Sequence, residues 1–302
     1  MELPNAESLH WIVTHYADFV AKHGEAIGQP ELVQPTGEFF PDEFSYDVQS
    51  VARLFERMLS YAPVSDDLEF GLQFVEPAAS AEGGCSSGGC SPSSAAGGGG
   101  GCATDAVASA GLRDGVLETD EGYVAVVKVD YVRHSTLLTT SLARSIGSII
   151  LAEADDDAAE GDLGLMSEIA ALASGFGVLL HQGAYVYGKS CGGARVQRAT
   201  QLSVEELGVA LALFMRHHGI KPSQARAHLD TTQRETFDKA LEWVDSNDAI
   251  VDGLRERPDE IALGFFELEP VRGLFGRVLA RQVRKRQDNA ETTPLLERAK
   301  TR

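Results

Sequence analysis

The chain has 302 residues, of which 43% are hydrophobic, and a formal net charge of −19. A chain of this length and apolar content can bury one large core or two modest ones. Its acidic balance argues against bulk nucleic-acid binding, which requires a cationic surface. Its four cysteines are too few for the disulfide framework of a small secreted protein.

The N-terminus and the hydropathy pattern favour a cytoplasmic protein. The chain begins Met1-Glu2-Leu3-Pro4, without the cationic head and apolar run of a signal peptide. No uninterrupted apolar run reaches the ~18 residues that a membrane-spanning helix needs. We therefore expect a cytoplasmic location and no transmembrane segment.

Two amphipathic helices are expected at the start of the chain, over residues 6–23 and 46–61. In both, apolar residues recur at spacings of three and four, which places them on one face of a helix. Asn5 can cap the first helix and Gly24 can end it. The prolines within 28–44 favour an extended connection between the two helices.

Two strands follow, separated by a segment of unusual composition. Apolar and polar residues alternate over 68–74, which predicts a strand with one buried face. The β-branched run over 123–129 predicts a second strand. Residues 78–111 between them are rich in Gly, Ser and Cys and hold almost no large apolar side chains. Because ordering such a segment costs entropy that no burial offsets, we expect a flexible insertion.

The remainder of the chain is predicted to be helical. Segments near 136–152 and 165–182 are apolar on more than one face, so both should be buried. His181 follows the second of these helices and is interpreted as a polar residue at its boundary. The adjacent His217 and His218 end a later helix, where imidazoles can interact favourably with the helix dipole and the last carbonyl groups.

Two capping signatures and one basic segment mark the C-terminal half. Ser203 with Glu206, and Thr232 with Glu235, each match the capping-box pattern that starts a helix. The last expected helix, near 270–286, holds six positive charges and no acid beside an apolar stripe. We expect it to dock on an acidic face of the protein or of a partner. Weak contact with an anionic lipid surface is the alternative.

The helix expected over 136–152 carries a resemblance to a known family. It reads Ser141-Leu-Ala-Arg-Ser-Ile-Gly-Ser-Ile-Ile-Leu151, which resembles the Leu-Ala-His-Glu-Leu-Ala-His-x-Leu-Leu pattern of a group of uncharacterised bacterial zincin-like proteins. The next helix, Glu168-Ile-Ala-Ala-Leu-Ala-Ser-Gly-Phe-Gly177, is similar to that group's acidic residue followed by Gly-Phe-Gly. The likeness runs, with gaps, from about residue 35 to 230.

The resemblance implies a metallopeptidase-like fold whose metal site is degenerate. In zincins the His-Glu-x-x-His spacing lets two imidazoles share a zinc ion, and the Glu activates the metal-bound water. Here Arg144 stands for the first His, Ser145 for the Glu and Ser148 for the second His. Of the zincin set only Glu168 remains, as the third ligand. We therefore expect no catalytic metal, and an ion pair between Arg144 and Glu168 across the vacant site.

Under this interpretation the chain is a helix-rich α+β domain with a small β-sheet, one long insertion and a helical C-terminal part. Its five parts are the N-terminal helices with the first strand (1–77), the flexible insertion (78–111), the degenerate zincin-like core (112–230), the C-terminal helices (231–287) and a polar tail (288–302).

The cysteines supply the alternative chemistry. Cys85, Cys90 and Cys102 lie in the insertion, and Cys191 lies in a Ser-Cys-Gly-Gly run. Thiolates suit zinc or Cu(I), but the spacing is loose and no His lies nearby in the sequence. We therefore favour a linker without chemistry over a metal site.

These observations favour a non-catalytic pseudoenzyme that acts as a binding or regulatory protein with a protein partner. The first alternative is a metal- or redox-active protein that uses the Cys-rich insertion. The second is a structural component in which that insertion is a tether. We expect no cofactor for the favoured function and zinc for the first alternative.

Overall fold

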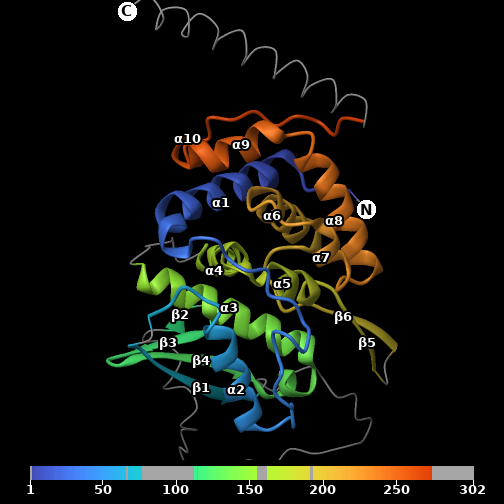
Figure 1. The fold of residues 1–302 in the computed structure, drawn as a ribbon. Helices are drawn as coiled ribbons and strands as arrows, with labels where there is room; N and C mark the ends of the chain where they lie inside the picture. The colour runs from blue at the N-terminus through green and yellow to red at the C-terminus, as the bar shows by residue number, and fades with distance from the viewer. Residues whose placement is uncertain are drawn as a thin grey trace, which may run out of the picture.

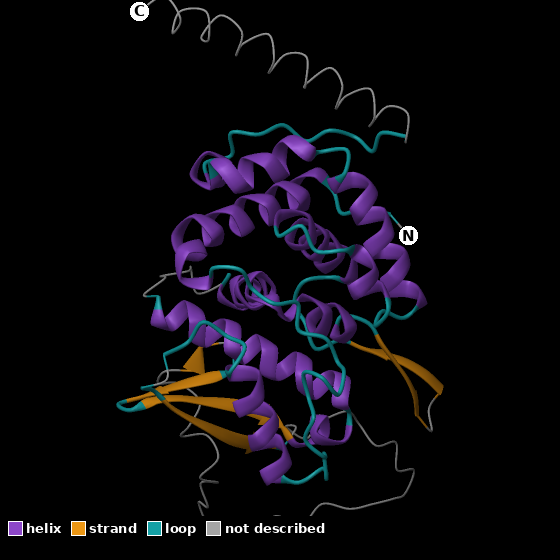
Figure 2. Ribbon diagram, in the orientation of Figure 1, coloured by secondary structure: helices purple, strands orange, loops and turns teal. Residues whose placement is uncertain are grey.

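The computed structural model describes residues 2–65, 67–76, 112–113, 115–154, 162–190 and 193–273. They form a mixed α+β fold dominated by helices, as the sequence predicts. Figure 1 shows a small sheet at one end of the molecule and stacked helices beyond it, and Figure 2 shows the same division by secondary structure. The insertion predicted over 78–111 lies outside the described residues.

The two helices expected at the N-terminus are confirmed as α1 (Ala6–Ile27) and α2 (Val48–Leu59). The Asn5 side chain caps α1 by accepting a first-turn backbone N–H at 2.8 Å, as its residue type predicts. Gly24 does not end this helix. The helix runs on to Gly28, whose φ of 64° lies in the left-handed region that favours glycine.

The sheet has four described strands in the order β1-β4-β3-β2. β1 pairs in parallel with β4, and β3 pairs antiparallel with β4 across a tight turn. The strands predicted over 68–74 and 123–129 are confirmed, whereas the two shorter strands between them were not expected. The bounds are β1 (Glu69–Val75), β2 (Leu112–Arg113), β3 (Val116–Thr119) and β4 (Gly122–Lys128).

Three buried helices form the centre of the molecule: α3 (Ser135–Glu153), α4 (Leu163–Ala171) and α5 (Gly177–Gly183). They confirm the two apolar helices predicted near 136–152 and 165–182, because α4 and α5 continue one another. In Figure 1, α3 lies across the sheet and α4 and α5 form the next layer. The sheet therefore contacts the helical body mainly through α3.

A single π-helical turn, Leu172–Phe176, joins α4 to α5. Within it Gly175 has φ of 105° and packs so closely that a methyl group there would overlap the Glu31 carbonyl oxygen. The Gly175 carbonyl oxygen accepts the Val33 N–H at 3.0 Å. The turn therefore fastens the extended segment after α1 to the central helices.

Gly147 allows α3 and α4 to pack backbone to backbone. A methyl group at this position would overlap the carbonyl oxygen of Ser167 on the facing helix. The side chains on either side of it, Ile146 and Ile149, are fully buried in the same core. The absence of a side chain at one position thus sets how near these two helices come.

The C-terminal half contains five helices and one hairpin among the described residues. The helix prediction is wrong at 186–197, where β5 and β6 pair antiparallel. Of the basic helix expected near 270–286, the first four residues are described and are irregular. The remainder lies outside the described residues. The bounds are β5 (Val186–Ser190), β6 (Gly193–Gln197), α6 (Val204–His217), α7 (Pro222–Arg226), α8 (Thr231–Val244), α9 (Asp248–Glu256) and α10 (Pro258–Ala262).

One of the two predicted capping boxes is confirmed. Ser203 and Glu206 exchange side-chain and backbone hydrogen bonds at the start of α6. The second prediction, Thr232 with Glu235, is wrong because α8 starts two residues earlier than that pattern requires. Its reciprocal bonds join Asp230 and Gln233. Asp is also a good N-cap residue, and Gln can replace Glu in the box.

Substituting Gly147 by alanine is expected to lower the free energy of unfolding by about 1–3 kcal/mol, because overpacking forces the backbones of α3 and α4 apart. The matched control is Gly37→Ala, since a methyl group at Gly37 would meet no atom within 4 Å. Urea unfolding of both variants measures the difference. Equal losses in the two would contradict the close approach at Gly147.

Candidate functional site

Arg144 on α3 and Glu168 on α4 form an ion pair in the middle of the molecule. The Arg144 Nε atom lies 2.9 Å from Glu168 Oε1. The Glu168 side chain is fully buried and that of Arg144 is 20% exposed. The ion pair predicted between these residues is therefore confirmed, and the close packing of α3 on α4 is what brings them together.

The buried carboxylate of Glu168 has two further donors. Its Oε1 accepts the Gln201 N–H at 2.6 Å and its Oε2 accepts the Leu202 N–H at 2.9 Å. Arg144 also donates from Nη1 to the Ala199 carbonyl oxygen at 3.1 Å. Hydrogen bonds to an ionised group are stronger than neutral ones. The pair consequently fastens the segment between β6 and α6 to α3 and α4.

The remaining two motif positions are occupied by buried serines. Ser148 Oγ lies 2.8 Å from Ser167 Oγ, beside Glu168 on α4. Ser167 in turn donates to the Leu163 carbonyl oxygen at 2.7 Å. Ser145 is also buried, near Gly115 at the start of β3. Positions 144 and 148 therefore both face α4, whereas position 145 faces the sheet.

This set of groups does not fit a catalytic zinc ion. Both carboxylate oxygens of Glu168 accept hydrogen bonds, and the positive charge of the Arg144 guanidinium would repel a metal cation bound beside it. Zinc in proteins needs three or four N, S or O ligands. Within the described residues no three His, Cys, Asp or Glu side chains are grouped to hold a metal ion. What the arrangement can do is fix the mutual position of three elements.

The four cysteines considered as metal ligands, Cys85, Cys90, Cys102 and Cys191, lie outside the described residues. The structure therefore gives no geometry for a thiolate site, and the cysteine hypothesis stays a prediction.

The prediction that His181 is a polar residue at a helix boundary is wrong, because its side chain is fully buried. Its Nε2 atom lies 3.0 Å from the Val204 carbonyl oxygen and 3.2 Å from Thr236 Oγ1. The ring thus connects α5 to the start of α6 and to the second turn of α8. Burial lowers its pKa to about 4, so the imidazole is neutral at pH 7. No motif surrounds this histidine in the sequence, so nothing there indicated that its side chain is buried.

His217 and His218 do end α6, as predicted, but they are not the cation at its C-terminus. Burial, with the charge of Arg255 as a further cause, lowers the pKa of both imidazoles to about 4. Arg255 instead donates to the carbonyl oxygens of Arg216 and His217. The buried Tyr16 hydroxyl is hydrogen-bonded to His217 Nδ1 at 3.1 Å, and a neutral imidazole has one nitrogen that donates and one that accepts.

Two helices pass a membrane-span test on length and composition alone, Ser135–Glu153 and Leu163–Gly183, among the residues that are described. Of their most apolar windows, 67% and 89% respectively are buried inside the fold. Core helices of water-soluble proteins pass the same test. Packing against neighbouring helices is therefore sufficient to explain why these segments are apolar.

Comparisons of the chain with protein-family models, with curated proteins and with solved structures find no match. Any statement on function therefore has to come from the chain's own residues and their geometry.

Removing the charge of Arg144 with Arg144→Met is expected to lower the free energy of unfolding by about 3 kcal/mol, because it leaves the Glu168 carboxylate buried without its cation. The double variant with Glu168→Gln should recover part of that loss, since no ion then remains buried. Urea unfolding of the wild type, the two single variants and the double variant gives the coupling energy.

The matched control for this cycle is Arg257→Met. Arg257 pairs with Glu260 at 2.8 Å, but the side chains are 64% and 50% exposed. Exposed pairs contribute about 1 kcal/mol or less. A loss at Arg144 no larger than the loss at Arg257 would show that the buried pair has no special structural role.

Acidification is expected to destabilise the protein through His181. The unfolded histidine binds its proton near pH 6.5 but the folded one only near 4, so protonation favours the unfolded state. The free energy of unfolding should fall as the pH drops from about 6.5 to 4, by about 3 kcal/mol from this residue. His181→Gln keeps a donor for Val204 and removes the titration. Urea unfolding across this range should show a flatter pH profile in the variant, and parallel profiles would refute the assignment.

Proposed function

We propose that the chain is a non-catalytic, zincin-like protein that acts by binding or regulation, and that it does so without a metal ion. The observation that carries this proposal is the Arg144–Glu168 ion pair, which occupies the position that a shared zinc would need. A carboxylate that is fully buried, with a guanidinium and two backbone N–H groups as partners, holds the structure together and is not accessible to a substrate.

The direction of the side chains supports the zincin comparison. Residues one turn apart on α3, Arg144 and Ser148, face α4 at Glu168 and Ser167. In a zincin the two metal-binding imidazoles have this relation to the helix that supplies the third ligand. The residue between them, Ser145, is buried beside the sheet. The helix positions are thus arranged as in a zincin, but their residues cannot bind zinc or activate a water molecule.

A binding role also agrees with the rest of the surface of the described chain. Large apolar residues remain exposed on several separate segments, among them Tyr46 at 62% and Phe265 at 70%. Side chains of this kind are enriched at protein interfaces. We propose a protein partner, and with it a cytoplasmic location, as the composition predicts.

Elemental mass spectrometry of the purified protein tests the metal-free part of the proposal. We expect less than stoichiometric zinc in the wild type, and no change when Cys85, Cys90, Cys102 and Cys191 are all replaced by serine. One equivalent of metal that disappears in the serine variant would overturn the proposal and assign the function to the cysteines.

The zincin comparison is tested by restoring its motif. The triple variant Arg144→His/Ser145→Glu/Ser148→His is expected to gain one equivalent of zinc, because positions 144 and 148 both face α4, where Glu168 would supply the third ligand. Adding Glu168→Gln to the triple variant should weaken that binding, and circular dichroism should show that both variants are folded. A folded triple variant that binds no zinc would contradict the zincin geometry.

A further inference from the structure

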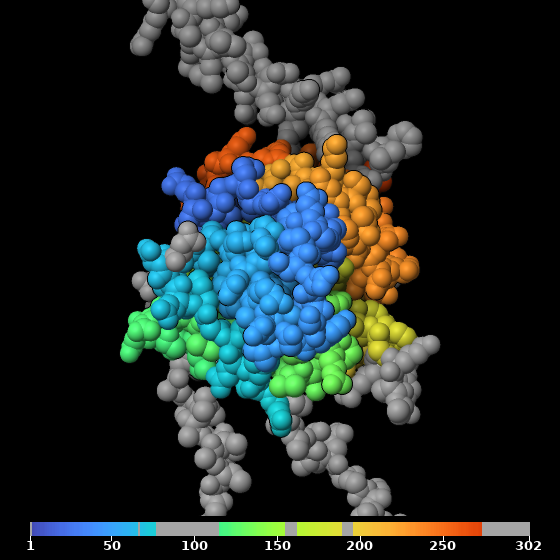
Figure 3. Space-filling view, turned by 60° about the horizontal axis from the view of Figure 1, so that its bottom comes forward, coloured from blue at the N-terminus to red at the C-terminus, as the bar shows by residue number. Residues whose placement is uncertain are grey.

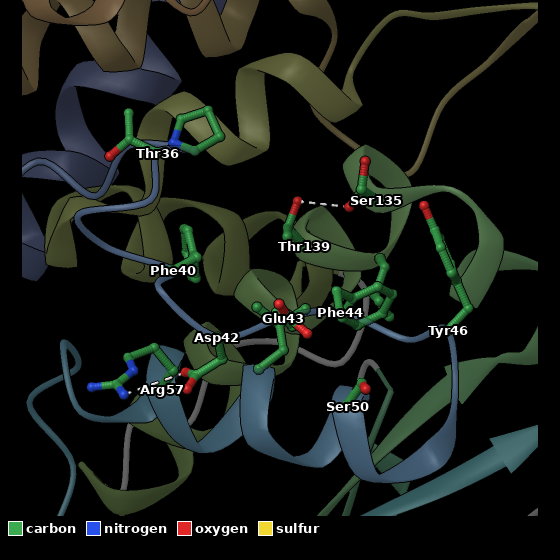
Figure 4. A pocket seen from close by; sticks show the side chains of 13 residues that line it. Thr36, Phe40, Asp42, Glu43, Phe44, Tyr46, Ser50, Arg57, Ser135 and Thr139 are labelled. Atoms are coloured by element: carbon green, nitrogen blue, oxygen red, sulfur yellow. Dashed lines mark hydrogen bonds and ion pairs between the residues drawn. The ribbon is translucent and has the colours of Figure 1, made fainter.

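A cavity of about 360 Å³ lies in the N-terminal part of the fold, and neither Arg144 nor Glu168 lines it. Its walls come from the segment 35–46 before α2, from α2 itself and from the first turns of α3. Figure 4 shows this pocket with its lining side chains, and Figure 3 shows the surface that residues of this part of the chain form at the front of the molecule. None of the four motif positions on which the proposed function rests lines this cavity.

The inner surface of the pocket is largely aromatic and aliphatic. Phe40, Phe44 and Tyr46 contribute rings, and Leu54 and Leu138 contribute aliphatic side chains. The rings of Phe44 and Tyr46 meet edge to face, with centroids 5.2 Å apart. Cavities of this size and composition are typical of sites that enclose one apolar group of a ligand.

The charge in the pocket is negative and partly unbalanced. Arg57 pairs with Asp42 at 3.3 Å, so these two charges offset each other. Glu43 also lines the pocket but makes no hydrogen bond or ion pair with any described residue. In Figure 4 it lies beside Phe44, between the Arg57–Asp42 pair and Tyr46. The pocket therefore presents one uncompensated carboxylate next to aromatic rings.

Tyr46 is held in a conformation that its residue type disfavours. Its φ of 58° makes it the one non-glycine residue with positive φ in the described part of the chain. Its side chain is 62% exposed, so burial does not hold it there. The backbone is fixed next to it, where Ser45 N–H donates to Ser50 Oγ at 3.1 Å and Asp47 caps α2. Strain of this kind accumulates at binding sites, where it positions a side chain in advance.

We propose that this pocket binds the cationic side chain of an arginine or lysine in a basic segment of a partner protein. The Glu43 carboxylate would pair with the cation, and the faces of Phe44 and Tyr46 would receive it through cation–π contact. The occupant is a peptide and not a free amine, because Val48, two residues after Tyr46 and 61% exposed, offers apolar surface that does not line the cavity. This inference names the class of partner and stands whether or not the zincin comparison holds.

Benzamidine tests the cation preference, because it combines a guanidinium-like head with an apolar ring that fits the cavity. Saturation-transfer NMR on the full chain should show binding of benzamidine and none of benzoate, its anionic counterpart. Glu43→Gln is expected to weaken benzamidine binding about tenfold or more, as expected for losing a hydrogen bond to a charged group. The control is Glu38→Gln, an exposed acid of the same segment that does not line the pocket. Binding of benzoate, or equal binding by the two variants, would overturn the proposal.

A second arm tests whether the ligand is a peptide. The fluorescent peptide Leu-Arg-Leu-Lys-Leu, with capped ends, should bind more tightly than benzamidine, and its version with Gln for Arg and Lys should not bind. Tyr46→Gly is expected to weaken the peptide while leaving the unfolding midpoint unchanged or higher, because glycine relieves the positive φ. A purely structural role for Tyr46 predicts the reverse, a lower midpoint with unchanged binding. A peptide no tighter than benzamidine would assign the pocket to small cations and contradict the partner-protein assignment.

Discussion

A carboxylate buried among helices requires a cation and hydrogen-bond donors, and the packing of the central helices meets that requirement for Glu168. Arg144 reaches it from α3, and the backbone of the segment before α6 closes over it. Three elements distant in the sequence are thereby held in one geometry. Because a buried ion pair is seldom more stabilising than a well-packed apolar contact, what it adds here is specificity of arrangement.

The same requirement explains the residues around the pair. Gly147 lets α3 and α4 come close enough for Arg144 to span the gap, and the hydrogen bond between Ser148 and Ser167 fills the next turn of the interface. On the opposite side of α3, side chains pack on the sheet. One helix therefore joins the two halves of the molecule: its Arg144 and Ser148 face α4, and its Ser145 lies beside the sheet.

Local sequence signals predicted the elements that depend on local physics. Asn5 and Ser203 cap helices because their side chains reach nearby N–H groups, and the apolar periodicity of α3 and α4 follows from burial. The depth of His181 depends on tertiary contacts that no local pattern encodes, whereas the hairpin at 186–197 had a local signal that was missed, since Val186, Tyr187 and Val196 flank a Gly-Gly pair. The Arg144–Glu168 pair was predicted through the resemblance to zincins, which implies that these two helices face each other at positions 144 and 168. The pocket had no such guide, because Phe40, Phe44 and Tyr46 have no regular spacing and meet only when folded.

The hydrogen bond between Val33 and Gly175 connects the outer segment before α2 to the central helices. The chain that carries the pocket is anchored there to the π-helical turn, and that turn continues directly from the helix that carries Glu168. A displacement of the outer segment is therefore transmitted through this hydrogen bond, and then through the backbone of the turn, to the helix that carries Glu168. Local opening of the π-turn would release the outer segment before the helices themselves separate. The Val33 amide would then exchange its hydrogen at the rate of that opening and not at the rate of global unfolding.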